Sequence, residues 1–97
     1  MGGGRIMEVR WVKDPESILD YAFNWRALGC LHPDESIVKY EITSVGVEVL
    51  RDSEEDGIVT VWVSGGTIRK RSIVSCKITT SANRIYKRSM QFIIKHK

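Results

Sequence analysis

The chain has 97 residues, a formal net charge of +3 and 42% hydrophobic residues, a composition ordinary for a globular protein. This length suits one hydrophobic core, so we expect a single domain over residues 7–97 behind a flexible glycine-rich leader, residues 1–6. No apolar run approaches the ~20 residues of a membrane-spanning helix. The sequence therefore predicts no membrane contact.

Acidic and basic residues are segregated along the sequence. The first 66 residues contain twelve acidic and six basic side chains, whereas residues 67–97 contain nine basic and no acidic ones. Two interpretations are open. Acidic and basic strands could neutralise each other within the fold, or the folded subunit could have one acidic and one basic surface, which would favour head-to-tail self-association.

The first expected element is a strand over residues 6–12, with Met7, Val9 and Trp11 on one face. Alternation of large apolar and polar residues places one row of side chains toward a core. This strand is expected to end before Pro15, because proline removes a backbone donor.

The next segment, residues 17–26, admits either a strand or a helix. A strand would place all four of its large apolar side chains on one face: Leu19, Tyr21, Phe23 and Trp25. Helical spacing would put Tyr21 and Trp25 on other faces. The strand is therefore the preferred interpretation.

The middle of the chain is expected to hold a turn-rich loop at 29–34, a strand at 37–43 and a further short strand. The first of these strands is predicted to place Val38, Tyr40 and Ile42 inward, and the second is predicted from Val45, Val47 and Val49. An acidic loop at 52–57 is expected to end the second of them.

The clearest strand pattern is residues 58–64, where Val59, Val61 and Val63 are predicted to point inward and Trp62 outward. Gly65-Gly66 is expected to open a loop that runs to Arg71.

The last two strands are predicted at 73–80 and 85–95, joined by a turn in which Asn83 has positive φ. Met90, Phe92 and Ile94 are expected in the core, as is Cys76. Both cysteines, Cys30 and Cys76, are expected to be reduced thiols.

About seven strands, turn residues every 8–12 positions and no clear helix together predict an all-β fold. This spacing is typical of a sandwich or a barrel. Seven strands in fewer than a hundred residues favour an immunoglobulin-like antiparallel β-sandwich. The cysteine positions do not match the inter-sheet disulfide of antibody domains, so packing alone would hold the sheets together.

The sequence predicts no catalytic, cofactor-binding or metal-binding residue, and therefore no enzyme. The two histidines, His32 and His96, have no Gly-x-Ser-x-Gly elbow beside them. Together with Cys30 and Cys76 they lack the close ligand pairs of zinc sites. Gly65-Gly66 lacks the Lys-Ser/Thr ending of a phosphate-binding loop.

A contact surface is predicted instead, made from two charged loops, the last two strands and one aromatic anchor. The candidate interface residues are Arg69, Lys70, Arg71, Arg84, Lys87, Arg88, Asp52, Glu54, Glu55, Asp56 and Trp62. The basic members could meet an acidic neighbouring subunit, or they could track a nucleic-acid backbone.

Four short motifs, taken in order, resemble a family of small tailed-bacteriophage and prophage proteins known as fibre–tail adaptors or minor tail and neck proteins. The motifs are Lys13-Asp14-Pro15, Leu19-Asp20-Tyr21 with Trp25, Val59-Thr60-Val61-Trp62-Val63-Ser64-Gly65-Gly66-Thr67, and Ile78-Thr79-Thr80-Ser81 with Arg84. The resemblance runs from about residue 7 to residue 95. Family members commonly have Gly at the position of Asn83, and residues 29–35 match no family pattern.

The resemblance implies an immunoglobulin-like sandwich and a non-catalytic virion structural protein. Such a protein would act as an adaptor or connector through contacts with other tail or neck proteins, with self-association or ring assembly in the particle. It would be located in the virion, and in the bacterial cytoplasm during assembly.

Two other function classes stay open. A recognition module for a cell-surface glycan or protein would need an exposed aromatic platform, for which the candidates are Trp25, Trp62 and Tyr40. A nucleic-acid-binding module would show an affinity that falls steeply with added salt.

Overall fold

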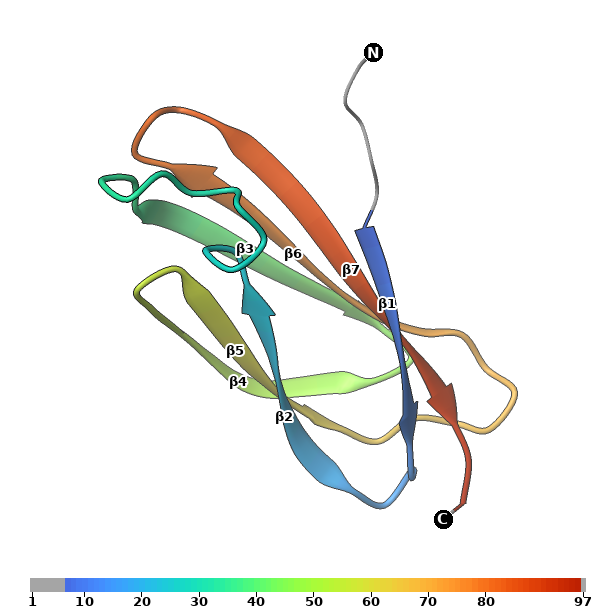
Figure 1. Cartoon of the computed structure of the whole chain (residues 1–97). Helices are drawn as coiled ribbons and strands as arrows, with labels where there is room; N and C mark the ends of the chain where they lie inside the picture. Colours follow the sequence, from blue (N-terminus) through green and yellow to red (C-terminus); the bar gives the residue numbers. More distant parts are fainter. Residues whose placement is uncertain (1–6, 97) are drawn as a thin grey trace.

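The computed structural model describes residues 7–96, so the predicted leader, residues 1–6, lies outside the described residues. The strands are β1 (Met7–Lys13), β2 (Ile18–Asn24), β3 (Ile37–Val45), β4 (Glu48–Glu55), β5 (Ile58–Ser64), β6 (Ser72–Thr80) and β7 (Ile85–Ile94). They form a four-stranded sheet in the order β1-β7-β6-β3 and a three-stranded sheet in the order β2-β5-β4 (Figure 1). Within residues 7–96 there is no helix that could cross a bilayer. The all-β prediction is confirmed.

The core lies between the two sheets and is built from the alternating rows that the sequence indicated. On β5, Val59, Val61 and Val63 are fully buried. The inward rows of β6 and β7 face them, contributing Val74, Cys76, Ile78, Met90, Phe92 and Ile94. Complete burial of one such side chain stabilises the fold by roughly 1.5–3 kcal/mol, so these three strands supply most of the cohesion between the layers.

The strand interpretation of residues 17–26 is confirmed, although β2 ends at Asn24. Phe23 and Trp25 are both in the core, and Trp25 reaches it from the turn that follows the strand. Leu19 is 45% exposed, because the inward row of β2 reaches an open side of the sandwich at this position.

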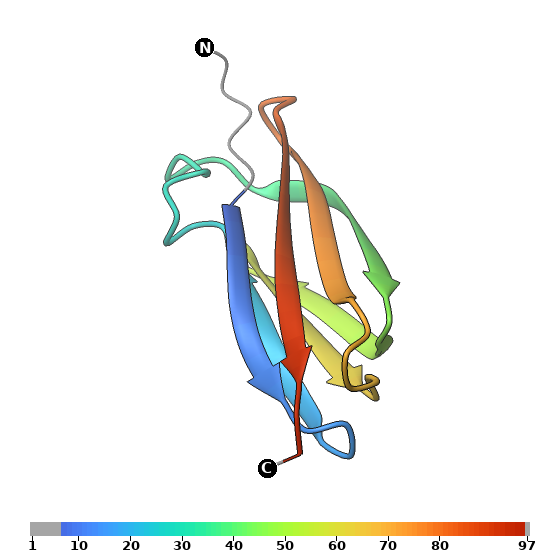
Figure 2. The same ribbon diagram turned by 90° about the vertical axis from the view of Figure 1, so that its right-hand side faces the viewer.

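The expected purely antiparallel arrangement is wrong for one strand pair. β1 runs parallel to β7, with Trp11 opposite Phe92 and Lys13 opposite Ile94. Figure 2 shows the two strands side by side with their arrowheads at the same end. An immunoglobulin constant-type sandwich places its first strand beside the second. Here β1 instead covers the edge of β7, and the immunoglobulin-like assignment stays a prediction.

The predicted inward position of Val38 is wrong. The pairing of β3 with β6 is irregular between Ile37 and Lys39, so that one extra residue is accommodated on β3. This bulge leaves Val38 62% exposed, while Ile37 packs against the core in its place. A bulge inserts an unpaired residue and so reverses the side-chain alternation on one side of it.

The predicted strand through Val45, Val47 and Val49 is also wrong in its bounds. β3 continues to Val45, and the chain then crosses to the other sheet at Gly46 and Val47 before β4 begins. Gly46 has a φ of +78°, a conformation that side chains rarely adopt.

The predicted acidic loop at 52–57 is mostly a strand, which corrects the sequence-based interpretation. β4 pairs with β5 as far as Glu55 opposite Ile58. The connection is a two-residue turn in which Asp56 and Gly57 both have positive φ, 51° and 83°. Asp-Gly is a preferred sequence for such a hairpin turn, and charges on a free edge strand deter unwanted pairing.

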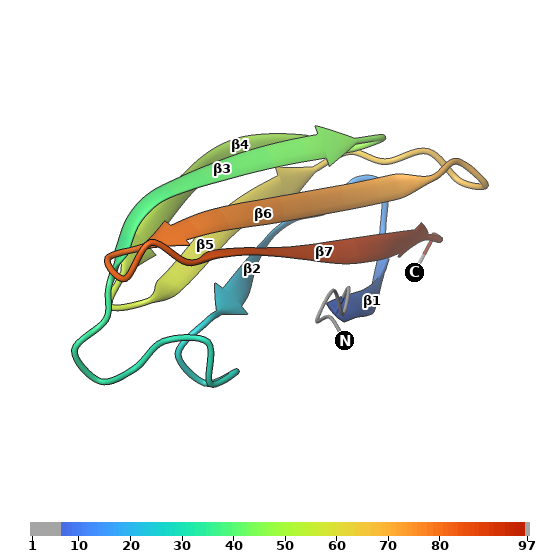
Figure 3. The same cartoon turned by 90° about the horizontal axis from the view of Figure 1, so that it is seen from above.

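The loop after Gly65-Gly66 and the turn at Asn83 are confirmed. The chain leaves β5 and the three-stranded sheet at Ser64 and enters the four-stranded sheet at Ser72, and Asn83 has a φ of 62°. β3, β6 and β7 are the long strands of the four-stranded sheet and run side by side when seen from above (Figure 3).

Candidate interaction surfaces

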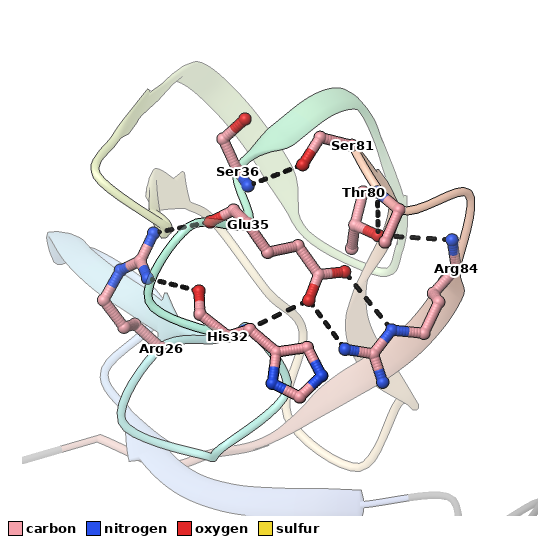
Figure 4. A network of polar contacts seen from close by, with 8 residues as sticks. Arg26, His32, Glu35, Ser36, Thr80, Ser81 and Arg84 are labelled. Carbon is pink, nitrogen blue, oxygen red and sulfur yellow. Dashed lines mark hydrogen bonds and ion pairs between the residues drawn. The ribbon is translucent and has the colours of Figure 1, made fainter.

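A buried carboxylate fastens the loop at 25–36 to the turn between β6 and β7. Glu35 is 4% exposed, and its carboxylate accepts hydrogen bonds from Arg84 Nη2 at 2.6 Å and Nε at 3.3 Å. The backbone amide of His32 donates a third bond at 3.0 Å (Figure 4). The hydrogen bonds from Arg84 contribute most to holding the pKa of Glu35 at about 2. Arg84, a predicted interface residue, is therefore committed largely to an internal ion pair.

Arg26 extends this network to the turn between β4 and β5. Its guanidinium donates to the carbonyl oxygens of His32, Glu35 and Asp56 at 3.0–3.2 Å. It also lies 3.5 Å from the Asp56 carboxylate, which is 82% exposed. Arg26 thus holds the long loop against the three-stranded sheet, at the end of the sandwich where Glu35 holds it against the four-stranded sheet through Arg84.

We expect the Glu35 ion pair to make stability depend on acid. The folded-state pKa of about 2 lies below the ordinary value of 4.5, so the contribution is present above pH 4.5 and is lost as pH falls toward 2. Chemical unfolding measured between pH 2 and pH 6 should show a steeper loss of stability for the wild type than for Glu35→Gln. The exposed neighbour variant Asp34→Asn is the control, and equal slopes for the wild type and Glu35→Gln would contradict the prediction.

Lys13 forms a second group of buried hydrogen bonds, at the opposite end of the sandwich. The residue is fully buried, and its ammonium donates to the carbonyl oxygens of Asp14, Ser17 and Gly65 at 3.0, 2.7 and 2.7 Å. Burial lowers the pKa of Lys13, opposed by the nearby charge of Asp14. These bonds tie the connection between β1 and β2 to the end of β5.

The predicted basic residues do not form one stripe. Arg69 and Lys70 are exposed in the loop between β5 and β6, at the end of the molecule opposite the β6–β7 turn (Figure 1). Arg84 is paired internally, and Arg88 is half-buried with an Nε that has no hydrogen-bond partner among residues 7–96. Arg71 and Lys87, by contrast, come together on the outer face of the four-stranded sheet.

That outer face is hollowed over β3, β6 and β7. Strand pairing aligns Thr43, Ser75 and Ser89 across the three strands, and the hydroxyl oxygens of Ser75 and Ser89 lie 2.8 Å apart. Three cations border these small side chains: Arg71, Lys77 and Lys87. We call these six residues the cationic hollow. Lys77 was not predicted as a contact residue, because only the register reveals that it lies opposite Lys87.

The predicted acidic residues lie together on the free edge of the three-stranded sheet. Glu48, which was not predicted, lies at the start of the same strand, and we call the five residues the acidic edge: Glu48, Asp52, Glu54, Glu55 and Asp56 on β4 and its turn. Asp52 accepts a hydrogen bond of 2.6 Å from the Tyr40 hydroxyl, which raises the pKa of Tyr40 to about 12. Four of the five side chains belong to largely exposed residues, and Glu54 alone is half-buried.

The predicted aromatic anchor, Trp62, lies on the outer face of the three-stranded sheet and is half-buried. The guanidinium of Arg51 lies 4.0 Å from the centre of its ring. Trp25 is in the core and Tyr40 is on β3 in the other sheet, so these aromatic residues do not form a common platform. The placement weighs against the glycan-recognition alternative.

Sequence reasoning did not identify a group of exposed apolar residues on β1, β2 and β7. Five large hydrophobic residues are 40–60% exposed there: Trp11, Val12, Ile18, Leu19 and Ile93. Val12 is the register partner of Ile93, and the Trp11 ring lies 5.5 Å from that of Tyr21 on β2. We call this group the apolar corner. Side chains alternate along a strand, so Trp11 and Val12, like Ile18 and Leu19, point to opposite faces and the group extends around the side of the sandwich. A concentration of exposed apolar residues is typical of a protein-binding surface.

Reactive groups are few and separated. Cys76 is fully buried, which raises the pKa of its thiol to about 12, and Cys30 is half-buried with a raised pKa. Asp14, Glu16 and His96 place potential ligand atoms within 4.8 Å of one another, but two of the three are exposed and nothing else points to an ion there.

Two packed sheets with charged and apolar surfaces on the outside define a β-sandwich module that can act through contact. A family model for the podophage GP4 fiber-tail adaptor protein gp77 matches residues 13–93. The chain belongs to this family, and a fibre–tail adaptor is a structural component of the virion. A comparison with curated proteins finds no match. The resemblance inferred from the four motifs is thereby confirmed at the level of the family.

Proposed function

We propose that this protein is a non-catalytic connector that joins other proteins of a phage tail or neck, with several copies associating in the particle. The family match over residues 13–93 carries the proposal. The bacterial cytoplasm is the proposed site of the chain before assembly.

The outer surface supports this function because a connector needs separate contact regions. The apolar corner lies on β1, β2 and β7, whereas the acidic edge lies on β4. The strand orders place β1 and β2 at one edge of their sheets and β3 and β4 at the other. A single copy can therefore touch two neighbours at once.

We assign the apolar corner to contact with another tail or neck protein. β3 and β4 are both interrupted by a bulge, and β4 carries the acidic edge. The pairing of β1 and that of β2 are regular. Val38, Val45 and Leu50 are exposed on the β3–β4 side as well. Bulges and charges protect a sheet edge against association, so the side with regular pairing is the one suited to a partner.

The test is incorporation into particles, with two variants matched for exposure. Ile18 is 60% exposed in the apolar corner, and Ile85 is 62% exposed outside it. We expect Ile18→Asp to lower the number of copies in purified particles about tenfold or more, because a charge in the centre of an interface is poorly tolerated. Ile85→Asp should incorporate as the wild type does.

Electron microscopy of the same particles should place the chain in the tail or neck. Absence of the wild-type chain from purified particles would contradict the proposed function. Equal incorporation of Ile18→Asp and Ile85→Asp would contradict only the assignment of the apolar corner.

A further inference from the structure

The cationic hollow contains a pair of like charges, and Glu41 is the acidic residue that lines the hollow beside them. Lys77 and Lys87 are directly opposite each other in the pairing of β6 with β7, and both are exposed. Like charges at directly opposed positions destabilise a sheet. Glu41, the other register partner of Lys77, has its ion pair with Lys39 at 3.4 Å instead.

Ion pairs within the fold involve little of the basic part of the chain. Residues 7–96 contain three ion pairs, Arg26–Asp56, Lys39–Glu41 and Glu35–Arg84. Only Arg84 comes from the part of the sequence that has no acidic residue. Glu35–Arg84 is thus one contact of the kind that neutralisation within the fold requires, while the other basic residues of this part have no ion pair among the described residues, which favours separate charged surfaces.

The acidic edge has the complementary charge and is accessible. Glu48 and Glu55 have no ion pair among the described residues and are exposed. β4 has an irregular pairing between Val49 and Arg51, so another strand would not add to it readily. The acidic edge is thus suited to a contact made by side chains.

We infer that the acidic edge of one copy docks in the cationic hollow of a second copy. The inference rests on the proposed function, because it identifies the contact through which copies would associate in the particle. Carboxylates of β4 would lie between Lys77, Lys87 and Arg71 and would relieve their mutual repulsion. The hydroxyl row of Thr43, Ser75 and Ser89 provides hydrogen-bond partners at the base of the hollow, whose larger part has a volume of about 440 Å³.

The two surfaces belong to different sheets, so the contact is heterologous. A heterologous contact repeats from copy to copy and gives a ring when the rotation closes. Because the contact is made by exposed charges, it should weaken as salt shortens the screening length from about 10 Å at 0.1 M.

Intermolecular paramagnetic broadening tests this contact directly, even when the affinity is low. One copy, at natural isotope abundance, carries a spin label on the cysteine introduced by Ser53→Cys, beside the acidic edge. Cys30→Ser is introduced in the same copy, so that the buried Cys76 is its one remaining native cysteine. A second, ¹⁵N-labelled copy is observed in the mixture at millimolar concentration. We expect broadening of the amides of Ser75 and Lys87, and none of Ala22 on the other sheet.

Charge reversal identifies the groups responsible. The double variant Lys77→Glu/Lys87→Glu should weaken the contact about tenfold or more. Lys70→Glu/Lys95→Glu makes the same change in net charge outside the hollow and should leave the broadening unchanged. A spin-labelled copy with Glu48→Lys/Glu55→Lys should restore the broadening of the Lys77→Glu/Lys87→Glu copy when the two are mixed.

Several results would overturn the inference. The first is the absence of broadening over β6 and β7 at low salt. The second is broadening that persists in Lys77→Glu/Lys87→Glu. The third is that the charge-reversed pair of copies fails to restore the broadening. Shifts of the same amides on addition of a short DNA duplex, without any effect of the spin-labelled copy, would assign the hollow to nucleic acid. If the chain is present in purified particles but gives no broadening, the proposed connector function is still supported and the proposed contact between copies is contradicted.

Discussion

Replacement of Gly46 by alanine should destabilise the protein by about 3 kcal/mol or more, since overlap and backbone strain act together there. A Cβ at this position would overlap the carbonyl oxygen of Arg71 and lie 3.0 Å from the Ser72 hydroxyl. The φ of +78° adds strain for any side chain. Gly46 is where the chain crosses from one sheet to the other, so neither strand can shift to make room. Urea unfolding followed by tryptophan fluorescence measures the loss.

Gly65→Ala is the matched control for this prediction. Its φ is +79°, and a Cβ there would meet no atom within 4 Å. The free energy of unfolding of this variant should therefore fall only by the cost of the backbone strain, about 1 kcal/mol. Equal losses for the two variants would show that strain alone, and not the close approach of the two segments, makes glycine necessary at position 46.

Replacement of Lys13 by methionine should destabilise the protein by about 3 kcal/mol. The apolar stem would be retained, but the carbonyl oxygens of Ser17 and Gly65 would lose their side-chain donor inside the fold. Each buried polar group left without a partner costs about 1–3 kcal/mol. The same urea titration provides the measurement, with thermal unfolding as a second probe.

Lys95→Met is the control, because Lys95 is exposed and close in sequence to the end of β7. A surface substitution of this kind changes stability by about 0.5 kcal/mol or less. A Lys13→Met protein as stable as the wild type would mean that the carbonyls find other partners. The result bears on the family resemblance, since Lys13-Asp14-Pro15 is one of the motifs that carry the resemblance. The lysine of this motif holds two segments of the fold together.

The strands with two-residue alternation could be predicted because the side chains that face the core must be apolar, which places an apolar residue at every second position. Val59, Val61 and Val63 are inward as expected, and Asn83 has the positive φ expected of its turn. β4 could not be recognised in this way. Its acidic residues line an edge, where no apolar row is required, although Asp56-Gly57 was available as a hairpin indicator.

The candidate surfaces were only partly predictable. The sequence separated acidic from basic residues and so gave four of the five members of the acidic edge, all except Glu48. It could not show that Arg84 would be used internally by Glu35, 49 residues away in the chain. Nor could it show that Lys77 would face Lys87, since that depends on the register of two strands.

The sequence by itself determined that this protein is a β-sandwich with one core and an uneven distribution of charge, because local alternation and composition record which side chains avoid water. Only the tertiary structure decided which strands are neighbours, which charges are consumed within the fold and which remain outside. Those properties arise from contacts between distant residues: the parallel pairing of β1 with β7, the bulge at Val38 and the opposition of Lys77 and Lys87. Such contacts leave no periodic pattern along the chain, and it is they that form the surfaces on which the function depends.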